Sequence, residues 1–191
     1  MTNMLPEDLP RARVTWTYDD LRTFPDDRNR YEIIDGALLV TPAPTITHQT
    51  LSKRIQFALM QQVEHRGLGL VFAAPVDVIF SATNVVEPDL VVVRTARRPI
   101  VTQRGIAGSP DLIIEILSPG TASTDRGRKL KLYADRGVAE YWIVDPDDSA
   151  IEVLVLGPEG YVLHGRFGPG DRVTSTLFQL DLPLDPLFAS F

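Results

Sequence analysis

The stretch DLIIEILSP, residues 111–119, has the composition of a strand buried on both faces, with one carboxylate inside it. Leu112, Ile113 and Ile114 lead into Glu115, and two more apolar residues follow it. Burying an unpaired charge costs several kcal/mol, which is as much as one substitution can take from a whole domain. Glu115 must therefore be paired with another group, or lie where the strand ends at a cleft.

The bulk composition predicts an ordinary globular protein. The chain has 191 residues, of which 44% are hydrophobic and 23% charged, enough to form a core without disulfides. It contains no cysteine, which excludes disulfides, thiolate metal sites and cysteine nucleophiles. We expect a cytoplasmic protein without membrane contact, because the sequence shows neither a secretory signal nor a membrane-spanning apolar run.

The net charge of -6 argues against a protein that coats nucleic acid, because neutralising phosphates requires a concentrated basic surface. An enzyme that touches nucleic acid through one local patch is still compatible with this charge. Carboxylates gathered at a metal site would also make the sum more negative.

The first part of the chain predicts helices and a hairpin. Residues 1–14 are expected to form a flexible tail, and residues 15–191 a single domain. A short helix is predicted at 17–24 with Thr17 as its N-cap. The Asp35-Gly36 pair within 31–40 is a strong hairpin signal. Residues 47–67 have apolar positions at helical spacing and end at a glycine.

The remainder predicts a mixed sheet flanked by helices, and hence an α/β fold. Strands are expected at 70–80, 85–93, 111–117 and 139–145. A polar, partly basic loop is expected at 95–109 and a helix at 125–137. From Ile151 onward, segments such as IEVLVL, GYVLHG and RVTSTL suggest antiparallel strands, with a last turn at PLDPLF.

Carboxylates on neighbouring strands are the most informative feature for chemistry. Asp89 follows Pro88 at the head of one strand, and Glu115 lies inside the next apolar strand. If the two strands are adjacent, both carboxylates lie near one sheet surface, where they would repel each other. A divalent cation removes that repulsion, and Mg²⁺ prefers oxygen ligands of this kind.

Two further residue types would complete a hydrolytic site. Glu32 is a third carboxylate set among apolar residues, in YEIIDG. A lysine ammonium can stabilise charge on an attacking water or on the transition state of phosphoryl transfer. Lys129 and Lys131, in the predicted helix after Glu115, are both candidates, and Lys129 lies four residues after Asp125 on one helix face.

These motifs together resemble the PD-(D/E)XK nuclease superfamily and, more closely, the Uma-type restriction endonuclease family of bacteria. The resemblance covers about residues 17–155 and rests on YEIIDGALLV, the His48-Gln49 pair, EPDLVVV, EILSP, D-x-x-x-K-x-x-x-Y from Asp125, and GVAEYWIVDP. In the superfamily motif a lysine would stand at position 117, where this chain has Leu117. The resemblance places that lysine on the following helix, at Lys129, with Lys131 as a rival.

The resemblance implies a restriction-endonuclease-like core with additional C-terminal strands. It implies that Asp89 and Glu115 hold Mg²⁺, with Mn²⁺ as a substitute and the carbonyl of Ile116 as a further ligand. It further implies that Lys129 orients or activates water and that Glu32 helps to hold the metal or its water. The implied reaction is hydrolysis of DNA phosphodiester bonds, and a homodimer is expected by analogy.

Simpler interpretations of each residue remain open at this point. Glu115 could pair with a basic residue at the edge of the core, and Asp89 could be a turn residue after proline. Lys129 could be a solvated partner of Asp125, and Glu32 an exposed strand residue. His48 is interpreted as a polar residue at a helix start, and Arg97, Arg98 and Arg104 as loop charges that could also meet phosphates.

The alternative function is a non-catalytic nucleic-acid or protein interaction module that retains the nuclease fold, because the fold alone does not fix the function. A small-ligand α/β binding protein is disfavoured, since the chain has no glycine-rich phosphate loop.

Overall fold

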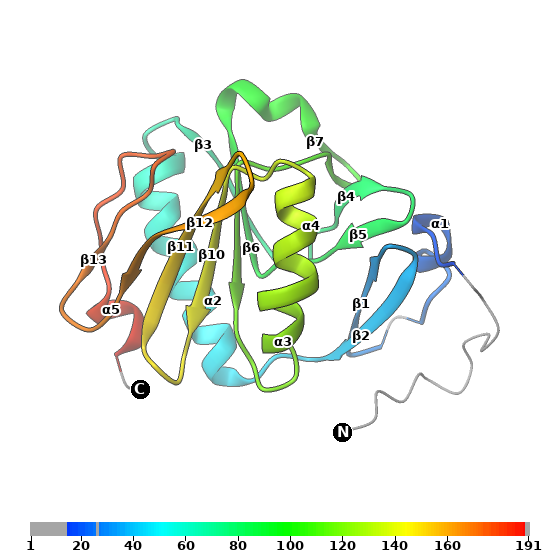
Figure 1. The fold of residues 1–191 in the computed structure, drawn as a ribbon, viewed down its shortest axis with the longest axis horizontal. Coiled ribbons are helices and arrows are strands. Elements are labelled where there is room, and N and C mark those ends of the chain that lie inside the picture. Colours follow the sequence, from blue (N-terminus) through cyan, green and yellow to red (C-terminus); the bar gives the residue numbers. More distant parts are fainter. Residues whose placement is uncertain (1–14, 26, 190–191) are drawn as a thin grey trace.

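A computed structural model describes residues 15–25 and 27–189 of the chain, so the tail predicted at 1–14 lies outside the described residues. The α/β prediction is confirmed, and the strands divide between two six-stranded mixed sheets and one two-stranded sheet (Figure 1). Within the described residues, no helix is both long and apolar enough to cross a membrane.

The central sheet has the strand order β12-β11-β10-β9-β6-β3. Its β9–β10 pair is parallel and its other pairs are antiparallel. The strands are β3 (Gly69–Ala73), β6 (Leu90–Arg94), β9 (Leu112–Ile116), β10 (Glu140–Asp145), β11 (Ala150–Gly157) and β12 (Gly160–Phe167).

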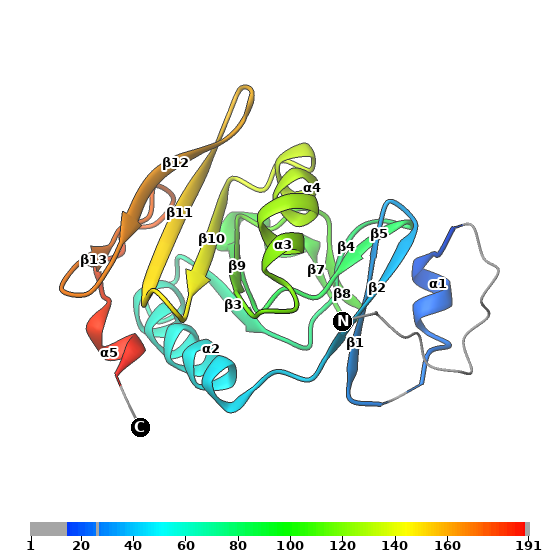
Figure 2. The same ribbon diagram turned by 60° about the horizontal axis from the view of Figure 1, so that its bottom comes forward.

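Both faces of this sheet are covered, which explains the continuous apolar runs of its inner strands. Helix α2 (Ile46–Leu59) packs on one face, against Leu90 and Ile114 among others. The helix that follows β9 packs on the other face, where Val91 and Ile113 point. Figure 2 shows the two helices on opposite sides of the sheet.

The two long predicted helices are confirmed, and each contains a π-helical turn. Helix α2 continues into η1 (Met60–Glu64), and Gly67 follows with a φ of 69°. The second helix runs through α3 (Ala122–Thr124), the π-helical η3 (Asp125–Lys129) and α4 (Leu130–Asp135), before Gly137 with a φ of 74°. Single π-helical turns inside α-helices are rare and occur often at functional sites.

The second sheet has the strand order β2-β1-β5-β4-β8-β7. The predicted hairpin is confirmed: its turn residues Asp35 and Gly36 have φ values of 51° and 75°, as a type I′ turn requires. The strands are β1 (Asn29–Ile34), β2 (Ala37–Pro42), β4 (Val78–Ser81), β5 (Asn84–Val86), β7 (Val101–Thr102) and β8 (Gly105–Ala107).

Two predicted strands were wrong as single elements, because proline interrupts both. The segment 70–80 divides into β3 of the central sheet and β4 of the second sheet, with Pro75 between them. The segment 85–93 divides in the same way into β5 and β6, with Pro88 between them. Proline has no amide hydrogen to donate to a strand ladder, so the chain changes sheet at these positions. The second break places Asp89 at the start of β6.

The loop predicted at 95–109 was also wrong, because it holds a 3₁₀ helix, η2 (Thr95–Ile100), and the β7–β8 hairpin. At the chain ends, α1 (Tyr18–Leu21) has the predicted cap at Thr17, and α5 (Asp185–Phe188) forms the predicted last turn. The β11–β12 pair is antiparallel as expected, whereas RVTSTL contributes only β13 (Arg172–Val173), which pairs with β14 (Leu182–Pro183).

Candidate active site

The two carboxylates predicted to lie close together start from adjacent strands. Strands β6 and β9 pair directly, with Leu90 opposite Ile114, so one further step of the register puts Asp89 opposite Glu115. The backbone N–H of Ile116 donates to Asp89 Oδ2 over 2.8 Å. Both carboxylates therefore project from the same face of the central sheet, toward the helix that carries Lys129.

The ammonium of Lys129 lies at the centre of an acidic cluster. Its Nζ is 2.9 Å from Glu32 Oε1 and 3.0 Å from Glu115 Oε1. Asp125 Oδ1 is 3.6 Å from the same nitrogen. Each of these four side chains is at most 3% exposed, so the ion pairs are screened from water.

The spacing of the helix explains which side chains reach Glu115. Asp125, Lys129 and Tyr133 recur every four residues and occupy one buried face. The hydroxyl of Tyr133 donates to Glu115 Oε1 over 2.7 Å, so that oxygen accepts hydrogen bonds from both Lys129 and Tyr133. The buried strand carboxylate is thus paired, as its position in an apolar strand requires.

Glu32 reaches the cluster from the second sheet. It lies on β1, and its Oε1 accepts a hydrogen bond of 2.9 Å from the backbone N–H of Glu87 as well as the bond from Lys129. The cluster therefore joins both sheets and the helix after β9. The starts of α2 and α3 lie at the same lower end of the molecule in Figure 1.

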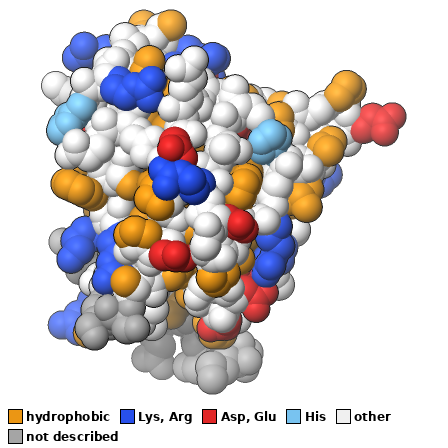
Figure 3. All heavy atoms as spheres, turned by 90° about the vertical axis from the view of Figure 1, so that its left-hand side faces the viewer, with side chains coloured by type: hydrophobic (Ala, Val, Ile, Leu, Met, Phe, Trp, Pro, Cys, Tyr) orange, Lys and Arg blue, Asp and Glu red, His pale blue; other side chains and the backbone are white. Residues whose placement is uncertain are grey.

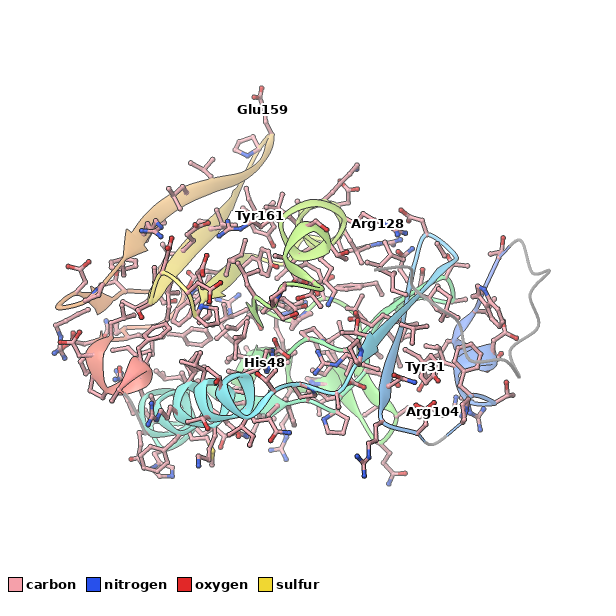
Figure 4. All side chains as sticks on the ribbon, turned by 90° about the horizontal axis from the view of Figure 1, so that it is seen from below. Tyr31, His48, Arg104, Arg128, Glu159 and Tyr161 are labelled. Atoms are coloured by element: carbon pink, nitrogen blue, oxygen red, sulfur yellow. The ribbon has the colours of Figure 1, made fainter. Side chains whose placement is uncertain are left out.

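Asp89 is bound by two basic side chains. Arg30 Nη1 lies 3.1 Å from its Oδ1, and His48 Nε2 lies 3.0 Å from its Oδ2. Arg30 also contacts Glu87 Oε1 through its Nε at 2.8 Å. Figure 4 shows His48 at the start of α2, near the centre of the view from below. Both oxygens of Asp89 therefore accept strong hydrogen bonds.

The electrostatics of the cluster favour uncharged Glu115 in the absence of further cations. Burial raises the pKa of Glu115 to about 8. The charge of Lys129 lowers this pKa, whereas the nearby carboxylates of Asp125 and Asp89 raise it further. Burial also raises the pKa of Asp125. For Lys129, burial lowers the pKa, but the surrounding carboxylates outweigh it and the net pKa is raised. For Asp89, burial raises the pKa, but His48, Arg30 and the Ile116 amide lower it overall.

The donor set fits a hard divalent cation. Glu32, Asp89, Glu115 and Asp125 are buried carboxylates, and Asp125 Oδ1 has no hydrogen-bond donor. Oxygen ligands of this kind suit Mg²⁺ and Mn²⁺. Within residues 15–25 and 27–189, however, no three His, Asp or Glu side chains form a ready-made metal-binding group. The carboxylates face Lys129 and Arg30 instead, so binding a cation would require some of these contacts to rearrange.

The predicted site residues Glu32, Asp89, Glu115 and Lys129 thus lie together. Ile116 is adjacent through its N–H, and the role of its carbonyl as a ligand stays a prediction. The rival Lys131 is 75% exposed and pairs with Asp135 on the surface, away from the cluster. The interpretations of Lys129 as a solvated residue and of Glu32 as an exposed one are wrong, because both side chains are buried.

Sequence reasoning gave too little weight to Arg30, His48, Asp125 and Tyr133. The D-x-x-x-K-x-x-x-Y spacing could have indicated that Asp125 and Tyr133 share the face of Lys129. No local pattern marks Arg30, and the His48-Gln49 pair of the family resemblance does not indicate the partner of His48, because Asp89 is distant in sequence from both residues. Among the loop arginines, Arg97 is structural: it pairs with buried Asp111 at 3.3 Å.

Three comparisons place the chain among known proteins. Residues 17–185 match the sequence model of a family named Uma2 and described as "Putative restriction endonuclease". An uncharacterized protein of Synechocystis sp., slr1290, is 24% identical over 162 residues, which are 84% of each chain. The crystal structure of a "putative nuclease belonging to DUF820" from Anabaena variabilis has a TM-score of 0.74 at 24% identity and covers 91% of this chain and 97% of that one. The structural likeness shows a shared fold.

Proposed function

The chain belongs to the Uma2 family, which supports a nuclease-like function, and we propose that it is a metal-dependent endonuclease that hydrolyses phosphodiester bonds in DNA. One observation carries this proposal. Buried carboxylates from two sheets and one helix converge around Lys129, and they outnumber the basic groups among them. A surplus of buried carboxylates favours either protonation, as for Glu115 without a metal, or a bound cation, and phosphodiester hydrolysis commonly uses a bound metal ion.

In this proposal Asp89 and Glu115, with the carbonyl of Ile116, would hold Mg²⁺ or Mn²⁺, and Glu32 would help to hold the metal or its water. The bound cation would polarise the phosphate and lower the pKa of water. The side chains of the protein would supply orientation, charge and proton transfer around it.

Lys129 acts in this scheme as a fixed positive charge. Because the surrounding carboxylates raise its pKa, it keeps its proton at neutral pH and cannot serve as a base. Its ammonium instead stabilises negative charge that develops on the phosphate or on the attacking water. Lys129 and Tyr133 both donate hydrogen bonds to Glu115 Oε1 and so fix the orientation of that carboxylate.

A plasmid-nicking assay tests the proposal. Supercoiled plasmid is incubated with the protein and Mg²⁺ or Mn²⁺, and the conversion to open circles is measured. We expect the wild type to nick, EDTA to abolish nicking, and Glu115→Gln to be inactive. Lys131→Ala is the matched control, since it removes a lysine of the same helix that lies outside the cluster, and it should nick like the wild type. Equal nicking by Glu115→Gln and the wild type would refute the proposal.

The existing hydrogen bonds of Asp89 favour one alternative, a nucleic-acid or protein interaction module that keeps the nuclease fold. Arg30, His48 and the Ile116 amide already satisfy both oxygens of Asp89, so this carboxylate can be stable without a metal. Binding of DNA by the wild type without any metal-dependent cleavage would support the module and contradict the enzyme.

We also propose a homodimer, by analogy with restriction-type nucleases, which often pair to cut both strands of a duplex. The face in Figure 3 has acidic, basic and apolar side chains interspersed, without a continuous basic surface, so we expect DNA to approach elsewhere. Light scattering with and without duplex DNA measures whether a dimer forms.

A further inference from the structure

A hollow lies beside the acidic cluster, on the opposite side of Arg30. It has a volume of about 390 Å³, within the range of roughly 300–1,000 Å³ that is typical of small-ligand pockets. Its walls come from the end of β3, the turn before β4, the β7–β8 hairpin and the segment between β5 and β6. The lining residues are Phe72, Pro75, Val76, Asp77, Glu87 and residues 101–106.

The lining combines flat apolar surfaces with two carboxylates. Phe72, Val76 and Val101 supply apolar walls, and Asp77 and Glu87 supply acceptors. Burial raises the pKa of Asp77, and a hydrogen bond from Tyr18 partly offsets this. Arg104 also lines the pocket, so its charge is mixed. Carboxylates beside apolar walls suit a flat ligand that donates hydrogen bonds.

The hairpin that forms one wall is tightly fixed to the rest of the pocket. Gly105 has a φ of 129°, and a Cβ there would lie 2.4 Å from the carbonyl oxygen of Asp77. The next residue, Ile106, donates its N–H to that same carbonyl over 2.8 Å. The hydroxyl of Tyr18 donates to the carbonyl of Arg104 over 3.2 Å. The pocket is therefore a preformed feature of the fold.

The pocket connects to the candidate active site through one side chain. Arg30 contacts Glu87 in the pocket wall at 2.8 Å and Asp89 in the cluster at 3.1 Å. Arg30 thus joins the wall of the pocket directly to the cluster.

We propose that this pocket binds a nucleobase that carries an exocyclic amino group, from the nucleic acid that occupies the candidate active site. The inference rests on the proposed nuclease function and deepens it. Asp77 and Glu87 accept hydrogen bonds from the amino group, as acidic side chains do from cytosine, while the apolar walls contact the ring. Thymine has no exocyclic amino group, so the pocket discriminates against it.

Fluorescence anisotropy with labelled single-stranded oligonucleotides tests this inference. The probes are oligodeoxycytidylate and oligodeoxythymidylate of equal length, in EDTA so that binding is measured without cleavage. We expect the wild type to bind the cytosine probe on the order of tenfold more tightly. Asp77→Ala should abolish the difference, and Asp77→Asn should reduce it, because an amide can also donate to thymine. Asp135→Asn changes an exposed carboxylate elsewhere and should keep the full preference.

Equal affinity of the wild type for both probes, a preference that survives both substitutions at Asp77, or no binding of either probe would overturn the inference. Thermal melts show whether each variant folds. If Asp77→Ala does not fold, the test rests on whether Asp77→Asn reduces the preference for the cytosine probe. The plasmid assay is independent of this measurement. A cytosine preference without nicking would support base binding in the pocket and refute the nuclease function. Nicking without a cytosine preference would support the nuclease function and refute base binding in the pocket.

Discussion

Replacing Lys129 by methionine removes the charge at the centre of the cluster while keeping most of the side-chain volume. Lys129 lies within 3.0 Å of both Glu32 and Glu115, and all three side chains are 3% exposed. Removing one partner of a buried ion pair typically costs about 3–5 kcal/mol, because the other charge is left unpaired. A domain of this size loses roughly 2–4 °C of melting temperature per kcal/mol, so we expect a loss of about 6–20 °C near neutral pH.

The loss should depend on pH in a direction set by the carboxylates. The pKa of Glu115 is already raised to about 8, and without the ammonium it rises further. A carboxyl group with a raised pKa in the folded state carries no penalty at low pH, and it destabilises the fold as the pH rises from its ordinary pKa toward the raised one, because only the unfolded state then ionises freely. The difference in melting temperature between wild type and Lys129→Met should therefore be smaller at about pH 5 than at about pH 8.5.

Thermal melts followed by circular dichroism at both pH values, without divalent cations, measure this difference. Lys131→Met is the matched control, because Lys131 is 75% exposed and its surface pair contributes little. A Lys129→Met protein that melts with the wild type at both pH values would refute the account of the cluster. A loss of melting temperature that is equal at the two pH values would also refute this account.

Three further predictions follow from the same contacts. Tyr133→Phe removes one hydrogen bond to Glu115 and should cost about 1–3 kcal/mol in free energy of unfolding, measured by urea denaturation; an unchanged midpoint would contradict the bond. Saturating Mn²⁺ should raise the melting temperature of the wild type by a few degrees but not that of Glu115→Gln, and an equal rise in both would place the ion elsewhere. Gly105→Ala should lower the melting temperature, because the new Cβ would lie 2.4 Å from the carbonyl oxygen of Asp77. Gly168→Ala is the control: a Cβ at that position has no atom within 4 Å, so the melting temperature should hardly change.

The sequence was sufficient to predict the main partners in the cluster where local patterns carry the information. A carboxylate among the apolar residues of a strand, such as Glu115, indicates a paired charge whatever the fold. A spacing of four residues is enough to put Asp125 and Lys129 on one face of a helix. The pairing of β6 with β9 was only a condition of the sequence argument, and the structure supplies it.

The rest depends on contacts that local patterns do not encode. Pro75 and Pro88 mark the places where the chain leaves one sheet for the other, but the sequence does not show that two sheets exist. Arg30 contacts Asp89 from 59 residues away, and its own neighbours do not distinguish it from any exposed strand arginine. His48 resembles any polar residue in a first helical turn until α2 is packed against the central sheet.

The π-helical turn at Asp125–Lys129 gives this helix a residue more than an α-helical turn would need. Loss of the exposed Gly127 would let the turn relax to α geometry and would bring Asp125 to three residues before Lys129. Positions three residues apart on an α-helix are still neighbours, so Asp125 would keep facing the buried ammonium, while Lys129 and Tyr133 would keep their hydrogen bonds to Glu115. The widened turn therefore makes this helix tolerant of a one-residue deletion that, in a regular α-helix, would turn the preceding acid away by roughly 100°.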